Sequence, residues 1–235
     1  MSETQTTPFT ISAFRVTVLT FACVLGCLAV WILAAEILRP LPIKFTTDPQ
    51  LAASNYGHRD AAIMAARIGL VRGDLWSEAA FAYGELVWSQ DKKASNTDVA
   101  QFERTRAVIA QAIRYAPHDS LLWLLFAANY FRNDWLNERA VAALKMSYYT
   151  GSNTIEVVPQ RLLLAIQSHA LDDAQFQELV HHDIRVAVKH KNELMPALVT
   201  AYNNATQSGR QFIEKALGEI NPGVLPAIHS GDDHR

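Results

Sequence analysis

The fold of this chain is decided by residues 116–149, APHDSLLWLLFAANYFRNDWLNERAVAALKMSYY. Asp119 or Ser120 can cap a helix there, and the residues that follow are apolar on almost every side of that helix. At about eleven residues the segment is too short to cross a bilayer, so it predicts a buried core helix. Asn133-Asp134 is expected to open a second helix, and the two segments together predict a helical hairpin.

The same helical spacing extends over most of the chain, from about Tyr56 to Leu217. Apolar residues recur at intervals of three and four, and the alternating runs typical of strands are absent. The first two helices are expected to pack through two apolar faces, formed by Ala61, Met64, Ala65, Ile68 and Val71 and by Leu75, Ala79, Ala82 and Leu86. Later helices are expected at about 99–115, 155–169, 172–190, 192–206 and 209–218. The predicted fold is all-α, with about eight or nine antiparallel helices over 55–220 in a solenoid or bundle.

One unit within this helical region carries a motif. Its matching residues are Pro117, Trp123, Phe126, Ala127, Tyr130, Ala140 and Leu144. With this spacing the stretch resembles a tetratricopeptide (TPR) unit, a helix–turn–helix repeat of about 34 residues, although Ala127 stands in place of the usual glycine. A looser echo of the pattern lies at residues 68–81. The resemblance implies a TPR-like fold and protein–protein scaffolding.

A long apolar run stands near the N-terminus. Residues 16–35, VTVLTFACVLGCLAVWILAA, include no charged side chain, and as a helix they would span about 30 Å, the thickness of the hydrocarbon core. The sequence therefore predicts one transmembrane helix over 16–38, after an N-terminal tail of residues 1–15. The anchor residues are expected to include Val16, Leu19, Phe21, Leu25, Leu28, Trp31 and Leu33.

Two other interpretations of the apolar run stay open. It can be a cleavable signal peptide with a poor cleavage site at Leu33-Ala34-Ala35, or a lipoprotein signal with Cys27 as the lipidated residue. A retained anchor is favoured because the run exceeds the apolar stretch of about 7 to 15 residues in a signal peptide. The residues after Cys27 also remain strongly apolar, unlike the polar tether of a lipoprotein.

The charges that flank the run do not decide its orientation, because basic residues stand on both sides of it. Anchors with short tails usually keep the N-terminus inside, so we expect a single-pass protein of the bacterial inner membrane with its large domain in the periplasm. Ala22 and Gly26 form a stripe of small residues that could support a homodimer.

The segments on either side of the helical domain are expected to be irregular. Residues 39–54 contain Pro40, Pro42 and Pro49, which predict a semi-stiff spacer between the membrane and the domain. Residues 221–235 are expected to form a flexible C-terminal tail.

The sequence offers no recognisable catalytic, cofactor or metal site, since phosphate-binding loops, G-x-S-x-G and H-E-x-x-H are all absent. Adjacent His181 and His182 point about 100° apart on a helix and cannot chelate one metal, so they are interpreted as solvated surface residues. His169 has workable spacing to Asp172 or Asp173 but receives the same interpretation. A basic strip on 99–115 is interpreted as a solvated face; its members are Arg104, Arg106 and Arg114.

These observations lead to a functional hypothesis. A net charge of −2 argues against a nucleic-acid partner. The chain is expected to be a membrane-anchored, non-enzymatic scaffold that needs no cofactor and contacts the lipid bilayer and unknown protein partners, in envelope or exopolysaccharide assembly by analogy of architecture. The alternatives are a membrane-anchored enzyme acting on envelope glycans or lipid-linked substrates, and a sensor that binds a small ligand between its helices.

Overall fold

The computed structural model describes residues 8–39, 42–46, 48–84, 96–132, 134 and 136–229, and these residues are all-α. They form the helices α1 (Pro8–Leu38), α2 (Pro49–Gly57), α3 (Arg59–Gly69), α4 (Gly73–Tyr83), α6 (Asn96–Tyr115), α7 (Ser120–Phe131), α8 (Glu138–Thr150), α9 (Val158–Ala165), α10 (Ala174–Lys189), α11 (Lys191–Asn204), α12 (Gln207–Ile220) and α13 (Leu225–His229). Three short 3₁₀ helices are interspersed, η1 (Ile155–Val157), η2 (His169–Asp172) and η3 (Pro222–Val224).

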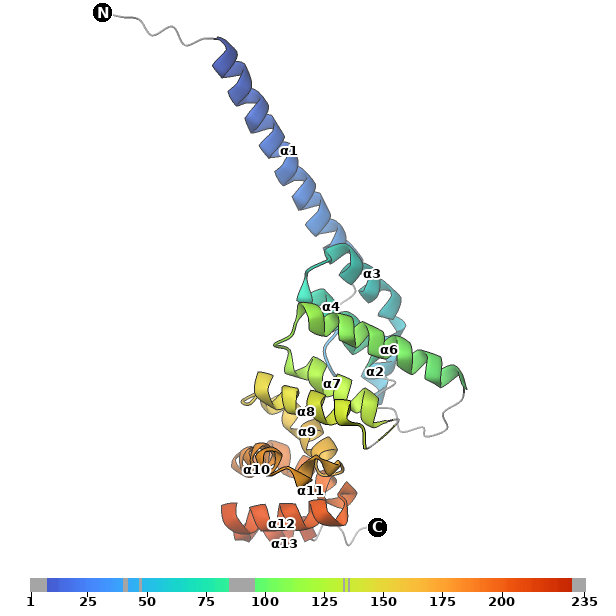
Figure 1. Cartoon of the computed structure of the whole chain (residues 1–235), viewed down its shortest axis with the longest axis vertical. Helices are drawn as coiled ribbons and strands as arrows, with labels where there is room; N and C mark the ends of the chain where they lie inside the picture. The colour runs from blue at the N-terminus through green and yellow to red at the C-terminus, as the bar shows by residue number, and fades with distance from the viewer. Residues whose placement is uncertain are drawn as a thin grey trace, which may run out of the picture.

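The helices after α1 pack as a stack in chain order. Figure 1 shows α1 projecting from one end of this stack, with α3 beside its base and α12 and α13 at the opposite end. Many helices pack against the next helix along the chain, as in the antiparallel pairs α3–α4 and α7–α8, and others pack mainly against the next but one, as α2 does on α4, α9 on α11 and α12 on α10. The all-α prediction is confirmed. Nine α-helices of the described part of the chain, α3, α4 and α6–α12, lie within residues 55–220, in agreement with the eight or nine expected, while α2 begins before this range and α13 follows it.

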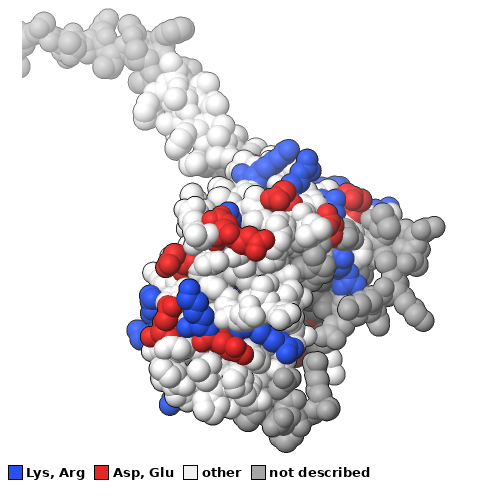
Figure 2. Space-filling model, turned by 60° about the horizontal axis from the view of Figure 1, so that its bottom comes forward, with Lys and Arg blue, Asp and Glu red and all other residues white. Residues whose placement is uncertain are grey.

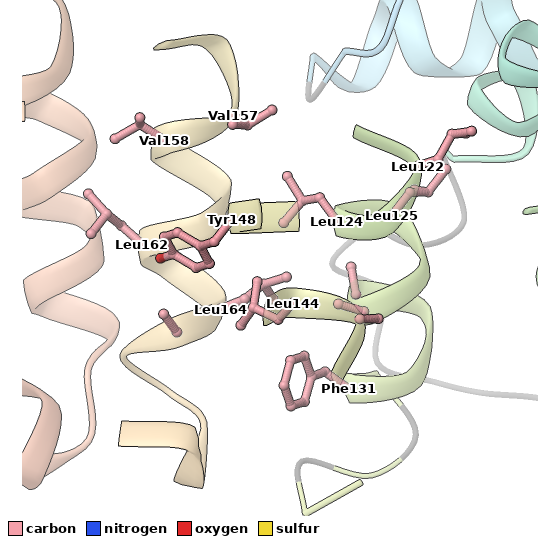
Figure 3. Packing of buried hydrophobic residues seen from close by; sticks show 14 of the residues in the cluster. Leu122, Leu124, Leu125, Phe131, Leu144, Tyr148, Val157, Val158, Leu162 and Leu164 are labelled. Carbon is pink, nitrogen blue, oxygen red and sulfur yellow. The ribbon is translucent and has the colours of Figure 1, made fainter. Parts of the chain in front are cut away.

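Helix α7 lies at the centre of the stack, and its position explains why its sequence is apolar on nearly every side. It packs against α6 and α4 on one side and against α8 and α9 on the other. In Figure 3, Leu124 and Phe131 of α7 point toward Leu144 of α8, while Leu122 and Leu125 point away from them. All of these side chains are fully buried. The predicted core helix is therefore confirmed.

Polar side chains begin several of these helices by accepting hydrogen bonds from free backbone N–H groups. Asp119 accepts from the N–H of Leu121 at 3.0 Å at the start of α7. Asn137 plays the same part for α8, so this helix begins at Glu138 and not at Asn133-Asp134 as expected. Asn133 itself lies outside the described residues.

The packing faces of two early helices differ from those expected. Helix α3 buries Ala62, Ala65, Ala66 and Gly69 and leaves Met64 exposed, while Val71 lies beyond its end, exposed in the turn before α4. Helix α4 buries Leu75, Ala79 and Ala82 as predicted, while Leu86 lies outside the described residues. The face of α3 was wrongly assigned because α3 packs on α1 as well as on α4, and small side chains let both neighbours approach.

The segment between α1 and α3 is more ordered than a spacer. Asp48 caps α2, which begins at Pro49 inside the range expected to be a linker. Ile43 is buried, and the ring of Phe45 packs edge-on against Phe81 of α4 with centroids 6.0 Å apart. The segment therefore packs on the domain. Pro40 lies outside the described residues.

The C-terminal segment also folds onto the domain. Residues 222–229 form η3 and α13, and the side chain of Ile228 is fully buried. This burial corrects the expectation of a flexible tail beginning at residue 221. Residues 230–235 lie outside the described part of the chain.

Gly151, the residue that follows α8, lies so close to Ser120 that there is no room for a side chain. Its φ of −145° is extended and does not require glycine. A Cβ atom at this position would lie 2.3 Å from the Oγ and 2.4 Å from the Cβ of Ser120, at the buried start of α7. Gly151 therefore allows the two ends of the hairpin to meet.

We expect Gly151→Ala to lower the free energy of unfolding by about 1–3 kcal/mol, because the added methyl group must displace Ser120. Thermal unfolding of the detergent-solubilised full chain measures the change. Gly218→Ala is the matched control, since nothing lies within 4 Å of a Cβ at that exposed helical position. The control should be neutral or stabilising by at most about 1 kcal/mol. Equal behaviour of the two variants would contradict the close-approach explanation.

Candidate functional site: the junction of α1 with the helical domain

Helix α1 presents an apolar surface to its surroundings. Its segment Ala13–Leu38 is long and apolar enough to cross a membrane, a property that signal sequences share. The expected anchor residues are all exposed on it, namely Val16, Leu19, Phe21, Leu25, Leu28, Trp31 and Leu33. Ala22, Gly26 and the free thiols of Cys23 and Cys27 are exposed on the same helix.

The last turns of α1 belong to the folded domain. The indole N–H of Trp31 donates a 2.6 Å hydrogen bond to the carbonyl oxygen of Ile68 on α3. One turn later Ala35 is 1% exposed and forms part of the hydrophobic core. A methyl side chain here lets α1 and α3 approach closely, so α1 is joined to the domain by packing as well as by the chain.

A bidentate ion pair strengthens this junction. The Nε and Nη2 atoms of Arg39 lie 3.0 Å and 2.5 Å from the two carboxylate oxygens of Glu78 on α4. The Glu78 side chain is only 12% exposed. Paired geometry of this kind is stronger and more directional than a single contact, and the two carboxylate bonds raise the pKa of Arg39 above its ordinary value.

The ion pair continues into a wider network through Glu36, near the end of α1. Its carboxylate accepts from Arg39 and from Arg72, each at 2.8 Å. Arg72 in turn binds Asp74 through two hydrogen bonds of 3.2 Å and 2.6 Å, and this pairing lowers the pKa of Asp74. Figure 2 shows blue and red side chains together at the base of α1. The network connects α1, the α3–α4 turn and α4.

We expect Arg39→Ala to lower the free energy of unfolding by about 1–3 kcal/mol, because Glu78 would keep a mostly buried carboxylate without its partner. Denaturant unfolding of the full chain in detergent, followed by tryptophan fluorescence, measures the loss. Arg104→Ala, at an exposed position of α6, is the control and should change stability by no more than about 0.5 kcal/mol. A loss at Arg39 no larger than that of the control would show that the network does not hold the junction.

A second polar cluster lies deep in the stack, between α8, α9 and α10. Arg161 and Asp183 are both fully buried, with 3.0 Å between Nη2 of Arg161 and Oδ1 of Asp183. Nη1 of Arg161 also donates to the carbonyl oxygens of Ser147 and Gly151. Its guanidinium stacks 4.5 Å from the ring centroid of Tyr148. The cluster joins three helices and is closed to solvent.

Burial controls the titration of this cluster. Loss of solvation raises the pKa of Asp183 to about 7, although the neighbouring Arg161 acts in the opposite direction. The same loss of solvation raises the pKa of Tyr148. An ordinary aspartate in an unfolded chain titrates near pH 4. The folded protein therefore binds the Asp183 proton more tightly than the unfolded chain does.

We expect the stability of the wild type to fall, relative to Asp183→Asn, as pH rises from about 4 to about 7. Over this window the folded state retains a proton that the unfolded state has released, so raising the pH favours unfolding. The asparagine variant has no such proton and supplies the reference at each pH. Urea unfolding of both proteins over this range measures the difference in their free energies of unfolding. A difference that does not change with pH would contradict the raised pKa.

This buried pair was not found from the sequence, because its two members lie 22 residues apart. The helical spacing around Asp183 nevertheless indicates that its side chain is buried. Asp183 falls on the same helical stripe as the buried Val180, Ile184 and Ala187, where a carboxylate needs a partner. That partner, Arg161, stands next to the buried Leu162 in α9.

Several histidines are more constrained than the solvated interpretation allowed. His181 and His182 are half-buried, and Nε2 of His181 lies 3.5 Å from Glu219 on α12. His169 contacts Glu138 at 3.2 Å. Within the described part of the chain, no group of three or more His, Cys, Asp or Glu residues is placed to hold a metal ion.

The basic strip of α6 is divided between two environments. Arg106 is engaged within the fold, because it binds Glu103 at 2.8 Å and Asn129 at 3.1 Å and stacks on Tyr130. Arg104 and Arg114 are exposed. The three arginines therefore do not form one continuous solvated face.

The residues that carry the TPR resemblance lie on and around α7 and α8. Ala127, Ala140 and Leu144 are fully buried, and Tyr130 is nearly so. Trp123 and Phe126 are half-buried, and their rings pack edge-on. Pro117 is exposed before α7, and its carbonyl oxygen accepts a hydrogen bond from the indole N–H of Trp123. Comparison of the chain with known protein families, with curated proteins and with solved structures gives no match.

Proposed function

We propose that this chain is a membrane-anchored, non-enzymatic scaffold that binds partner proteins through a TPR-like helical domain. The observation that carries the proposal is the junction described above, where an exposed apolar helix enters the packed end of the stack. Such an arrangement holds a stacked helical surface at a membrane in a defined orientation. Stacked helical hairpins commonly present extended surfaces to partner proteins.

The junction favours a retained anchor over a cleaved signal. Cleavage after Ala35 would remove the hydrogen bond from Trp31 to Ile68 and take Ala35 out of the core. It would also place a new N-terminus beside Glu36, within the ion network. A segment that the folded domain uses for its own packing is poorly suited to removal.

The helical domain also carries an exposed aromatic residue suited to a partner contact. Tyr149 is 54% exposed at the end of α8, while its neighbour Tyr148 is buried. Tyrosine is enriched at the energetic centres of protein interfaces. We place the partner-binding surface on this side of α8, and the setting that we propose is the periplasmic face of a bacterial inner membrane, in envelope or exopolysaccharide assembly.

Site-specific photo-crosslinking in intact cells tests the proposal. A photoreactive amino acid at Tyr149 should give a discrete crosslinked species of reproducible mass, and the same amino acid at the exposed Gln175 of α10 serves as the control. The protein recovered from membranes should have the intact mass of the full chain and should resist alkaline carbonate extraction. A truncated mass or carbonate release would reject the anchor. A membrane-retained chain with no crosslink at Tyr149 would reject this partner-binding surface.

A further inference from the structure

Two exposed apolar side chains stand at the tip of the α3–α4 turn. Leu70 is 53% exposed and Val71 is 71% exposed, and we call this pair the turn patch. The turn closes with a hydrogen bond from the N–H of Arg72 to the carbonyl oxygen of Gly69. The next residues of α4 turn inward, since Leu75 and Trp76 are buried. The patch therefore projects from the domain without a partner among the described residues.

The backbone of Leu70 is in a conformation that favours glycine. Its φ is 49° and its ψ is −82°, and among the described residues it is the only non-glycine with positive φ. A branched side chain in this region strains the backbone, so a glycine would fit the turn better. Leu70 is also more than half exposed, so packing within the fold offsets little of this strain.

Two indole groups hold this strained turn in place. Trp31 donates to the carbonyl oxygen of Ile68, and Trp76 donates to that of Leu70 at 2.8 Å. Because Trp31 belongs to α1, its hydrogen bond to Ile68 places the α3–α4 turn beside α1 at the level of Trp31. Figure 1 shows the end of α3 next to the base of α1.

That position coincides with the boundary expected for a bilayer. The apolar segment of α1 runs from Ala13 to Leu38, and when it is counted from Ala13 a helix of about 28 Å, close to the thickness of the hydrocarbon core, ends at Trp31. Tryptophan prefers the zone between hydrocarbon and water. A bilayer whose hydrocarbon core begins at Ala13 therefore ends at the level of Trp31, where the turn patch projects. Arg67, one helical turn before the turn patch on α3, is exposed.

We infer that the turn patch is a second membrane contact, in which Leu70 and Val71 insert into the interfacial zone of the bilayer beside α1. The inference rests on the proposed anchoring by α1, since the patch continues the apolar surface of that helix. The occupant is the lipid bilayer. The α3–α4 turn thus seats the helical domain directly on the membrane surface.

Spin-label accessibility of the full chain tests this contact. In a Cys23→Ala, Cys27→Ala background, single cysteines replace Val71, Leu25 of the apolar helix and Leu136, which is 72% exposed before α8. Each labelled protein is reconstituted in nanodiscs of phosphatidylcholine and phosphatidylglycerol. Power saturation then compares the access of oxygen, which enters lipid, with that of a water-soluble nickel chelate.

The three positions separate the outcomes. The Val71 label and the Leu25 label should both be more accessible to oxygen than to the nickel chelate. The Leu136 label should be more accessible to the chelate. A Val71 label that behaves like Leu136 while Leu25 reports lipid would overturn the turn contact and leave the anchor standing. A Leu25 label that also reports water would reject the anchor itself. A Val71 label shielded from both reagents would indicate a protein contact and overturn the inference.

Leu70→Gly provides an independent test of the strained position. The variant relieves the positive φ, which offsets the greater freedom that glycine gives the unfolded chain, so the unfolding midpoint in detergent should not fall. The same change should make the Val71 label in nanodiscs more accessible to the chelate, because the larger anchoring side chain is lost. A lower midpoint would show that Leu70 packs within the fold and would contradict its assignment to the bilayer.

Discussion

The close packing of α1 against α3 is the constraint on which the rest of this structure depends. Ala35 enters the core because its side chain is small, and Trp31 reaches across to the backbone of Ile68. These contacts make the last turns of α1 part of the domain. The bidentate pair between Arg39 and Glu78 then fixes α4 to the same junction. A spacer free to bend would have left the domain without a defined orientation.

The sequence-based predictions succeed where the apolar pattern of a single segment is enough to identify its structure. The apolar character of residues 120–131 was sufficient to predict a buried helix and its hairpin, because each of its sides meets another helix. The all-α class followed from the three- and four-residue spacing along the chain. The apolar run of α1 was equally clear, since its exposed side chains need no tertiary partner to be recognised.

The failures have a common physical cause in contacts between distant segments. The face of α3 could not be assigned without knowing that α1 covers part of it, so Met64 and Val71 were placed in the core. The Arg161–Asp183 pair matches no motif, and although its helical spacing places Asp183 on a buried stripe, that spacing does not identify Arg161 as the partner. The spacer prediction failed in a similar way, since prolines at positions 42 and 49 are compatible with packing on the domain and with the start of a helix.

Because the helices stack away from one fixed end, the number of helices sets how far the outermost ones lie from α1. In Figure 1 the stack extends away from α1, so α12 and α13 lie farthest from the point where the apolar helix enters. Each added layer of helices extends the reach by about 8–10 Å, the spacing between packed helices. Gain or loss of one hairpin would therefore move the outermost helices by a discrete step, while the junction at the base of the stack stays unchanged.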